Sequence, residues 1–369
     1  MRLEWEVLEL RPADPFRISR SLQTSARRVW VRLEHEGLEG WGEADPSDYY
    51  GESADTVVLA LVRLSPLLAA AGDPELLEPL EREMALRAPE AGSARAAVSA
   101  ALHDLAGKIR GAPLWRLLGL DPAEAPPSSM TIGIDEPEVV EEKARRAADW
   151  PVLKVKVGTT RDREILEAVR AGAPSARLVA DANAAWTVEE ARAMLPVLAG
   201  FGVEFVEQPL AADDLAGYAA LREGAEIPIV VDESCLVATD IPALVGRVDG
   251  INIKLPKCGG VREAVRMVHV ARAFGLDVMM GCMLASTLGI APALHLAPLL
   301  DFADLDGAAL LAEGEDPFTG PHLERGKIVP GEEPGLGVRR ARPSQSSESG
   351  SRSISSLRPP EGWPRRSER

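Results

Sequence analysis

From about residue 126 onward, short apolar stretches alternate with longer amphipathic ones at a regular interval. The intervening stretches carry apolar residues at helical spacing, as in Asp162–Ala171, Val188–Ala199, Val261–Phe274 and Leu288–Leu300. Strands that alternate with helices predict a parallel α/β sheet, and eight of them predict its closure into a (β/α)8-type barrel rather than an open doubly wound sheet. The eight predicted strands are Met130–Ile134, Val152–Val157, Arg177–Asp181, Val203–Glu207, Pro228–Asp232, Gly250–Lys254, Leu276–Gly281 and Phe302–Asp306.

The first 125 residues do not show this regular alternation of predicted strands and helices. Val29–Glu34 and Leu38–Glu43 flank a turn and predict a hairpin, while Ser53–Ala71 and Gly92–Ile109 predict helices. The second helix is rich in small residues, which suits close packing. A proline-rich linker at Asp121–Pro127 then leads to the barrel, so an α+β domain is expected at residues 1–125.

Charged residues end five consecutive predicted strands, and the C-terminal strand ends of such barrels carry the chemistry. Three carboxylates there provide oxygen ligands for a hard cation such as Mg²⁺. A lysine on strand two faces a lysine on strand six across the ring, and Lys154 lies on the same strand face as the first of them. The series is Lys156, Asp181, Glu207, Asp232 and Lys254, at intervals of 25, 26, 25 and 22 residues.

Lysine usage supports proton transfer at this edge. The chain has 41 Lys plus Arg but only seven lysines, and four of them (Lys154, Lys156, Lys254 and Lys257) fall in two barrel segments. Lysine deprotonates and arginine does not, so all four positions are predicted to serve proton transfer. A single acid at a strand end commonly caps the next helix, but three in succession between lysines disfavour that alternative.

Composition and charge argue against several classes of protein. The net charge of −16 argues against nucleic-acid binding, and no apolar run reaches membrane-spanning length. Three cysteines without metal-site spacing and a start without a signal-peptide pattern predict a cytoplasmic protein, expected to be a homo-oligomer. No Gly-rich nucleotide fingerprint follows a strand. Residues 339–369 hold eight arginines against three glutamates and predict a disordered basic tail.

The segments VLKVKVG, VADAN, VEQPL, VVDES and NIKLPKCGG resemble the barrel motifs of the enolase superfamily, in its muconate-lactonizing subgroup. GWGEA at 40–44 resembles a motif of that family's N-terminal capping domain, and the resemblance runs from about residue 1 to 338. It implies a capping domain at 1–125, a modified (β/α)7β barrel at 126–320, and a segment at 321–338 that returns to the cap.

The resemblance also implies roles for individual residues. Lys154 would contact a substrate carboxylate and tune Lys156, and Asn183 would lie beside the metal ligands or take a helix-side polar role. The implied ligands of one Mg²⁺ are Asp181, Glu207 and Asp232, and the implied acid/base pair is Lys156 and Lys254.

Asp304 and Asp306, two carboxylates at the end of strand eight, suit a substrate ammonium group. They resemble the pair that holds the N-terminal amine in dipeptide epimerases. GCMLASTLG at 281–289 resembles the corresponding strand-seven segment of those enzymes, and places Cys282 and Met283, with Thr131, beside the substrate.

Two features set this chain apart from its apparent relatives. Several of them carry Glu where this chain has Ala285. Residues 15–24 and 45–53 resemble substrate-covering loops, and Arg20 lies one position from an arginine that binds an acidic substrate side chain in Ala–Glu-specific relatives. Arg20 is therefore a candidate substrate-binding residue.

These observations predict a Mg²⁺-dependent isomerase that epimerises the C-terminal residue of L,L-dipeptides through two lysines and a metal-stabilised enediolate. The alternatives in the same superfamily are an N-acylamino acid racemase, an o-succinylbenzoate synthase and a cycloisomerase, whose substrates have no free ammonium. A non-catalytic barrel that binds an acidic metabolite is the remaining alternative, and it predicts decay of the constellation, which the sequence does not show.

Overall fold

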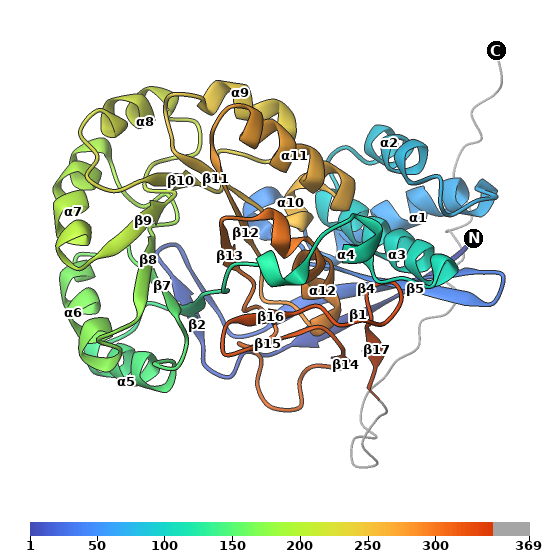
Figure 1. Cartoon of the computed structure of the whole chain (residues 1–369), viewed down its shortest axis with the longest axis horizontal. Coiled ribbons are helices and arrows are strands. Elements are labelled where there is room, and N and C mark those ends of the chain that lie inside the picture. The colour runs from blue at the N-terminus through green and yellow to red at the C-terminus, as the bar shows by residue number, and fades with distance from the viewer. Residues whose placement is uncertain (342–369) are drawn as a thin grey trace.

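The computed structural model describes residues 1–341, and the rest of the predicted basic tail, 342–369, lies outside the described residues. Eight parallel strands run in sequence order around the ring in Figure 1. Ser128 and Ala303 form a parallel bridge, and the Ser129 N–H donates to the Ala303 carbonyl at 2.9 Å, so the first and last strands also meet. The predicted barrel is confirmed. Its strands are β6 (Met130–Ile132), β7 (Val152–Lys156), β8 (Arg177–Asp181), β9 (Val203–Glu207), β10 (Ile229–Val231), β11 (Gly250–Ile253), β12 (Asp277–Gly281) and β13 (Phe302–Asp304).

A small apolar cluster fills the barrel beneath its charged edge. Because residues two apart on a strand share a face, this cluster lies on the same faces as the charged residues that end the strands. For example, Val179 precedes Asp181 by two positions and Phe205 precedes Glu207. The barrel interior therefore changes from apolar to charged within one pleat. The cluster consists of Val152, Val179, Phe205, Val230 and Met279.

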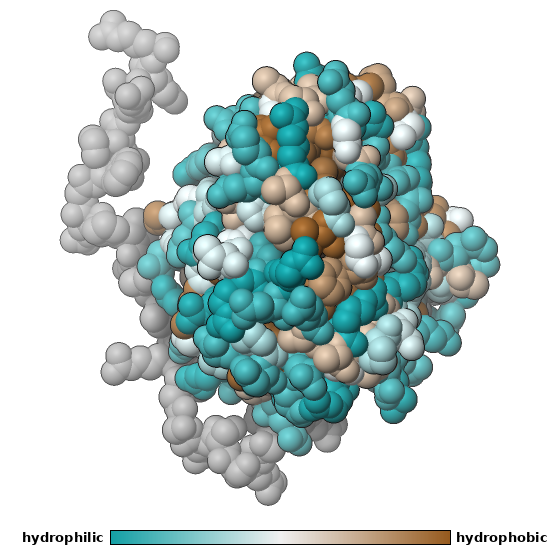
Figure 2. Space-filling model, turned by 90° about the vertical axis from the view of Figure 1, so that its left-hand side faces the viewer, coloured by the Kyte–Doolittle hydropathy of each residue, from teal (hydrophilic) through white to brown (hydrophobic). Residues whose placement is uncertain are grey.

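Helices surround the strand ring (Figure 1). In α6 (Asp162–Gly172), Ile165, Leu166 and Val169 face inward while Arg163 and Glu167 are exposed, as the amphipathic pattern predicts. Figure 2 shows this outer side of the barrel, where hydrophilic side chains predominate and apolar atoms appear between them. The other helices of this layer are α5 (Pro137–Arg146), α7 (Val188–Gly200), α8 (Leu215–Arg222), α9 (Ile241–Leu244), α10 (Leu255–Cys258), α11 (Val261–Ala273) and α12 (Thr287–Leu296).

The N-terminal domain is a three-stranded antiparallel sheet, β1 (Arg2–Leu10), β4 (Ala26–His35) and β5 (Leu38–Ala44), covered by helices α1 (Ala54–Ala70), α2 (Leu77–Arg87) and α3 (Gly92–Arg110). The hairpin β4–β5 and two of the helices are the predicted ones, whereas β1 and α2 were not predicted. Gly40 and Gly42 allow the small-residue helix α3 to lie against β5. A Cβ at either position would come within 2.0 Å or 2.1 Å of a carbonyl oxygen of α3.

Several short elements lie outside the two sheets and the main helices. Residues 15–24, predicted as a loop, form a short hairpin of β2 (Phe16–Ile18) and β3 (Ser21–Gln23), and a 3-10 turn, η1 (Asp48–Tyr50), lies in the second predicted covering segment. Short helical pieces, α4 (Leu114–Leu117), η2 (Pro122–Glu124), η3 (Ala238–Asp240) and η4 (Ala297–Leu299), complete the helical structure of the described residues.

After the barrel, β14 (Phe318–Thr319), β15 (His322–Glu324), β16 (Lys327–Val329) and β17 (Arg339–Arg340) follow. The assignment of 339–340 to a disordered tail was wrong, because β17 pairs with β14. The C-terminal segment contacts the first domain, where the Leu336 N–H donates to Asp104 at 2.8 Å. In residues 1–341 no helix is both long and apolar enough to span a membrane, and the three cysteines form no disulfide. Location, oligomeric state and the domain boundaries stay predictions.

Candidate active site

The predicted site residues gather around one cavity of about 840 Å³ at the C-terminal ends of the strands. β7 and β11 lie four places apart in the eight-stranded ring, so Lys156 and Lys254 approach from opposite sides. Asp181 and Glu207 are fully buried and do not line the cavity. The predicted residues that line the cavity are Arg20, Thr131, Lys154, Lys156, Asn183, Asp232, Lys254, Cys282, Met283, Asp304 and Asp306.

Lys154 is the centre of a buried ion network. Its Nζ lies 3.0 Å from Asp181, 2.6 Å from Glu207 and 2.8 Å from Asp304, and the side chain is 1% exposed. Burial lowers the pKa of Lys154, but these three carboxylates outweigh burial and raise it well above the ordinary value. Lys154 is therefore a fixed ammonium in this arrangement, and its predicted contact with a substrate carboxylate stays a prediction.

The two candidate acid/base lysines are each paired with one carboxylate. Lys156 Nζ lies 2.6 Å from Asp181, and Lys254 Nζ lies 2.9 Å from Asp232. Burial lowers the pKa of Lys254, but Asp232 outweighs it, so the pKa is raised rather than brought toward neutrality. A Cβ on Gly281 would lie 2.9 Å from Lys254 Cε, so the glycine leaves room for this side chain.

The pKa values of the three predicted metal ligands are shifted in different directions. Burial opposes ionisation of all three, but Lys154 and Lys156 lower the pKa of Asp181, and Lys254 and Lys257 lower that of Asp232. Glu207 has its pKa raised to about 7 by burial and by the charge of Asp181. The Glu207 side chain is thus the least compensated carboxylate of the three.

This donor set fits a hard cation. It consists of three buried carboxylates, and Glu207 Oε2 has no hydrogen-bond partner although it lies 2.6 Å from the Lys154 ammonium. Among residues 1–341, no three acidic, histidine or cysteine side chains converge as ready-made metal ligands, and the acids are bound to lysines instead. Asp181, Glu207 and Asp232 are the residues that would hold a divalent ion.

The contacts of Lys257 contradict its predicted role in proton transfer. Its Nζ donates to Asp232 Oδ1 and to the carbonyls of Asp232, Cys235 and Asn252, and its side chain is 1% exposed. It does not line the cavity. Lys257 is a structural cation that joins the loop after β10 to β11.

Two amides that the sequence did not single out orient the acids. Asn252 donates to Glu207 Oε1 at 2.7 Å. Gln208 accepts the Asp232 N–H at 2.8 Å through Oε1 and donates through Nε2 to Leu210, Tyr218 and Ser234. Gln208 stands inside the quoted motif VEQPL, directly after a metal-ligand candidate, but spacing alone does not reveal which backbone groups an amide reaches.

Asp304 and Asp306 form the wall opposite the metal-ligand candidates, and their surroundings differ. Asp304 accepts from Ser129 Oγ at 2.6 Å and from Lys154, whereas Asp306 accepts the Thr131 N–H at 2.6 Å. The predicted strand ends at Asp306, whereas β13 ends at Asp304, so Asp306 lies two residues beyond the observed strand end. Burial and the charge of Asp304 raise the pKa of Asp306 to about 7. A cationic group of a ligand next to Asp306 would remove the free-energy cost of ionising this carboxyl.

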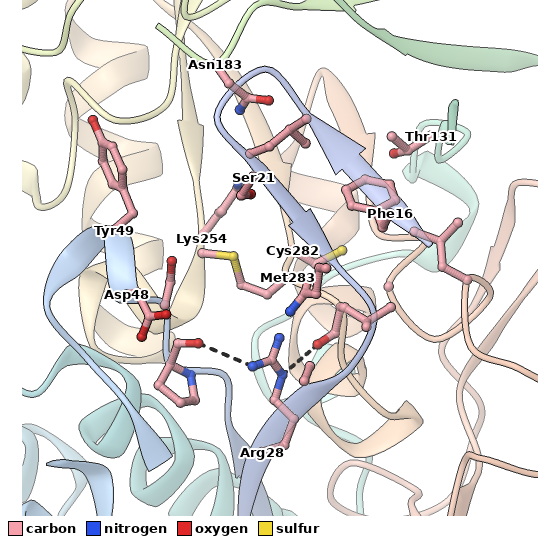
Figure 3. A pocket seen from close by; sticks show the side chains of 18 of the residues that line it. Phe16, Ser21, Arg28, Asp48, Tyr49, Thr131, Asn183, Lys254, Cys282 and Met283 are labelled. Atoms are coloured by element: carbon pink, nitrogen blue, oxygen red, sulfur yellow. Dashed lines mark hydrogen bonds between the residues drawn. The ribbon is translucent and has the colours of Figure 1, made fainter. Parts of the chain in front are cut away.

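The loop after β12 is held in place from the N-terminal domain. Arg28 donates from Nε to the Leu284 carbonyl at 2.6 Å and from Nη1 to the Pro46 carbonyl at 3.2 Å, the bonds dashed in Figure 3. Glu43, in the motif GWGEA, accepts the Ser286 N–H at 2.8 Å. These bonds keep Cys282 and Met283 at the cavity wall, where Figure 3 shows them near Lys254 and Arg28.

Comparison with known proteins places this site in a family. Residues 3–119 match the mandelate racemase/muconate lactonizing enzyme N-terminal domain, and residues 138–342 match the enolase C-terminal domain-like model. The chain therefore belongs to the mandelate racemase/muconate lactonizing enzyme family of the enolase superfamily.

Individual relatives are epimerases and racemases. An L-Ala-D/L-Glu epimerase of Bacteroides thetaiotaomicron is 37% identical over 92% of this chain and 88% of its own length. The structure of a dipeptide epimerase from Enterococcus faecalis with Mg and L-Leu-L-Tyr is 34% identical, with a TM-score of 0.86, over 91% of this chain and 98% of that one. An N-succinyl Arg/Lys racemase from Bacillus cereus is 26% identical, also with a TM-score of 0.86, over 92% and 95% of the two chains.

Proposed function

We propose that this protein is a Mg²⁺-dependent dipeptide epimerase that inverts the α-carbon of the C-terminal residue of L,L-dipeptides. One observation carries the proposal: the cavity has an acid/base candidate on each of two opposite sides, Lys156 and Lys254, and a carboxylate pair, Asp304 and Asp306, on a third. A dipeptide carries an ammonium at its N-terminus, which the carboxylate pair would bind. At its C-terminus it carries a carboxylate next to the α-carbon that the two lysines would flank.

Asp181, Glu207 and Asp232 would hold the ion, which supplies Lewis-acid polarisation of the substrate carboxylate when bound. One lysine removes the α-proton and the other returns a proton to the opposite face, so the configuration inverts. Lys156 and Lys254 are almost fully buried, at 8% and 9% side-chain exposure, but both line the cavity, where a bound substrate would meet them.

Asp306 would receive the substrate ammonium, with Asp304 and Thr131 beside it. A buried carboxylate with a raised pKa gains most from a cationic ligand, because the ligand removes the cost of its ionisation. Such a charge-assisted hydrogen bond contributes about 1.5–3 kcal/mol, or roughly tenfold to a hundredfold in kcat/KM.

The test compares a good L,L-dipeptide with its N-acetyl form, in the wild type and in Asp306→Asn. The proposal predicts a preference for the free dipeptide of tenfold or more, which shrinks in the variant. Equal kcat/KM for both substrates in the wild type would reject the dipeptide assignment and favour an N-acylamino acid racemase.

Metal dependence is tested separately. Exhaustive dialysis against EDTA is expected to abolish turnover, and added Mg²⁺ is expected to restore it. Asp232→Asn should fail to recover with Mg²⁺. Undiminished activity after dialysis, with the metal content verified by elemental analysis, contradicts the assignment of the three acids.

A further inference from the structure

The turn of the β2–β3 hairpin lies against the barrel rim next to the candidate metal ligands. Ser19 and Arg20 form this turn, and Arg20 Nη1 donates to the Asn183 carbonyl at 2.7 Å. Ser19 Oγ donates to the Ala182 carbonyl at 3.3 Å. Figure 3 shows Asn183 beside this turn. Both acceptors belong to the loop that begins directly after Asp181.

The second contact of Arg20 is with a buried carboxylate. Arg20 Nη2 lies 2.7 Å from Glu233 Oε1, and the Glu233 side chain is 0% exposed. Neither Glu233 oxygen has a further hydrogen-bond partner among residues 1–341. Arg20, whose side chain is 32% exposed, is thus the charge that compensates Glu233, and its removal would leave this buried carboxylate without its cation.

The third contact joins the two covering segments. The Arg20 guanidinium carbon lies 4.1 Å from the centre of the Tyr49 ring, in a cation–π arrangement. Tyr49 belongs to η1, in the segment 45–53. Arg20 therefore connects three separate parts of the cavity wall: the hairpin, the η1 segment and the barrel rim.

We infer that Arg20 is a positioning residue that fastens the hairpin and the η1 segment over the cavity, and that it is not the receptor for an acidic substrate side chain. A substrate carboxylate would have to displace Glu233, which would leave that buried carboxylate without its cation. With one Nη atom bound to the Asn183 carbonyl and the other next to Glu233, Arg20 then offers no free positive charge to the cavity. Resting on the proposed function, this predicts a preference for C-terminal residues with uncharged side chains over acidic ones.

The experiment uses the full chain with Arg20→Met and, as matched control, Arg17→Met. Arg17 is an exposed residue of the same hairpin and does not line the cavity. Kinetics are measured with L-Ala-L-Glu and L-Ala-L-Gln, which differ in side-chain charge but hardly in size. Backbone hydrogen–deuterium exchange of residues 16–23 is measured in all three proteins.

The wild type is expected to use L-Ala-L-Gln at least as efficiently as L-Ala-L-Glu. Arg20→Met should lower kcat/KM for both by a similar factor, leaving their ratio within about twofold, and should accelerate hairpin exchange at least tenfold. Arg17→Met should change neither. A selective loss of L-Ala-L-Glu activity by tenfold or more in Arg20→Met, or unchanged hairpin exchange, overturns the inference.

The two readouts separate the inference from the function on which its substrate preference rests. If the wild type epimerises neither dipeptide, the proposed function fails for these substrates. The exchange measurement then still decides whether Arg20 fastens the hairpin.

Discussion

Replacing Lys257 by Met tests whether this lysine is structural. The substitution keeps a linear side chain of similar length but removes the buried ammonium that binds Asp232 Oδ1 and three backbone carbonyls. Removing one partner of a buried ion pair typically costs about 3–5 kcal/mol, because the remaining charge and its acceptors lose their compensation. We therefore expect the free energy of unfolding to fall by about 3–5 kcal/mol.

The control is Lys143→Met. Lys143 pairs at 3.0 Å with Asp135, at 13% and 40% side-chain exposure, and partly exposed pairs of this kind contribute about 0–1 kcal/mol. Urea unfolding followed by tryptophan fluorescence gives both values, and far-UV circular dichroism checks that the variants are folded. A loss below 1 kcal/mol for Lys257→Met, similar to the control, would refute the structural role and return Lys257 to the proton-transfer candidates.

Three further predictions concern the site and the stability of the fold. Gly281→Ala should reduce kcat at least tenfold, because its Cβ would press on Lys254 Cε and on Asn252. Gly200→Ala, where nothing lies within 4 Å, should leave kcat unchanged in the same assay. His295 is fully buried, and burial lowers its pKa to about 4. Below about pH 6.5 the unfolded chain therefore binds a proton at this histidine that the folded chain does not bind. The stability advantage of wild type over His295→Gln in urea titrations should therefore be full at pH 7.5 and shrink by about 1.4 kcal/mol per pH unit as pH falls from 6.5 toward 4. Lys156→Ala and Lys254→Ala should each abolish epimerisation followed by polarimetry, and full two-way epimerisation by either variant would contradict the paired-lysine mechanism.

Much of the barrel follows from local pattern. The strands are short, mostly apolar runs, and five consecutive ones end in a charged residue or are directly followed by one. These charged residues meet because parallel strands end at the same edge. For this reason the spacing along the sequence was enough to predict that five charged residues lie at one edge of the barrel: Lys156, Asp181, Glu207, Asp232 and Lys254. Strand β1 was overlooked because it is an edge strand with glutamates at many positions, and its partner β4 follows only after the hairpin β2–β3.

The partners of individual side chains were not predictable in the same way. Lys257 is held by carbonyls of two loop residues and one strand residue, and backbone carbonyls leave no mark in the sequence. Arg20 and Glu233 are 213 positions apart and meet only because the hairpin turns over the barrel rim. Residue type and spacing indicate which chemistry is present, whereas the partner of each charge depends on the closed fold.

Isotope exchange at the α-carbon tests the central claim most directly. The protein with Mg²⁺ is incubated with a set of L,L-dipeptides in D₂O, and the C-terminal α-proton is followed by proton NMR. The account predicts that this signal disappears and the L,D-isomer accumulates, that the N-terminal α-proton is retained, and that EDTA stops both changes. No exchange in any free dipeptide, together with exchange in N-acylated amino acids, would contradict it.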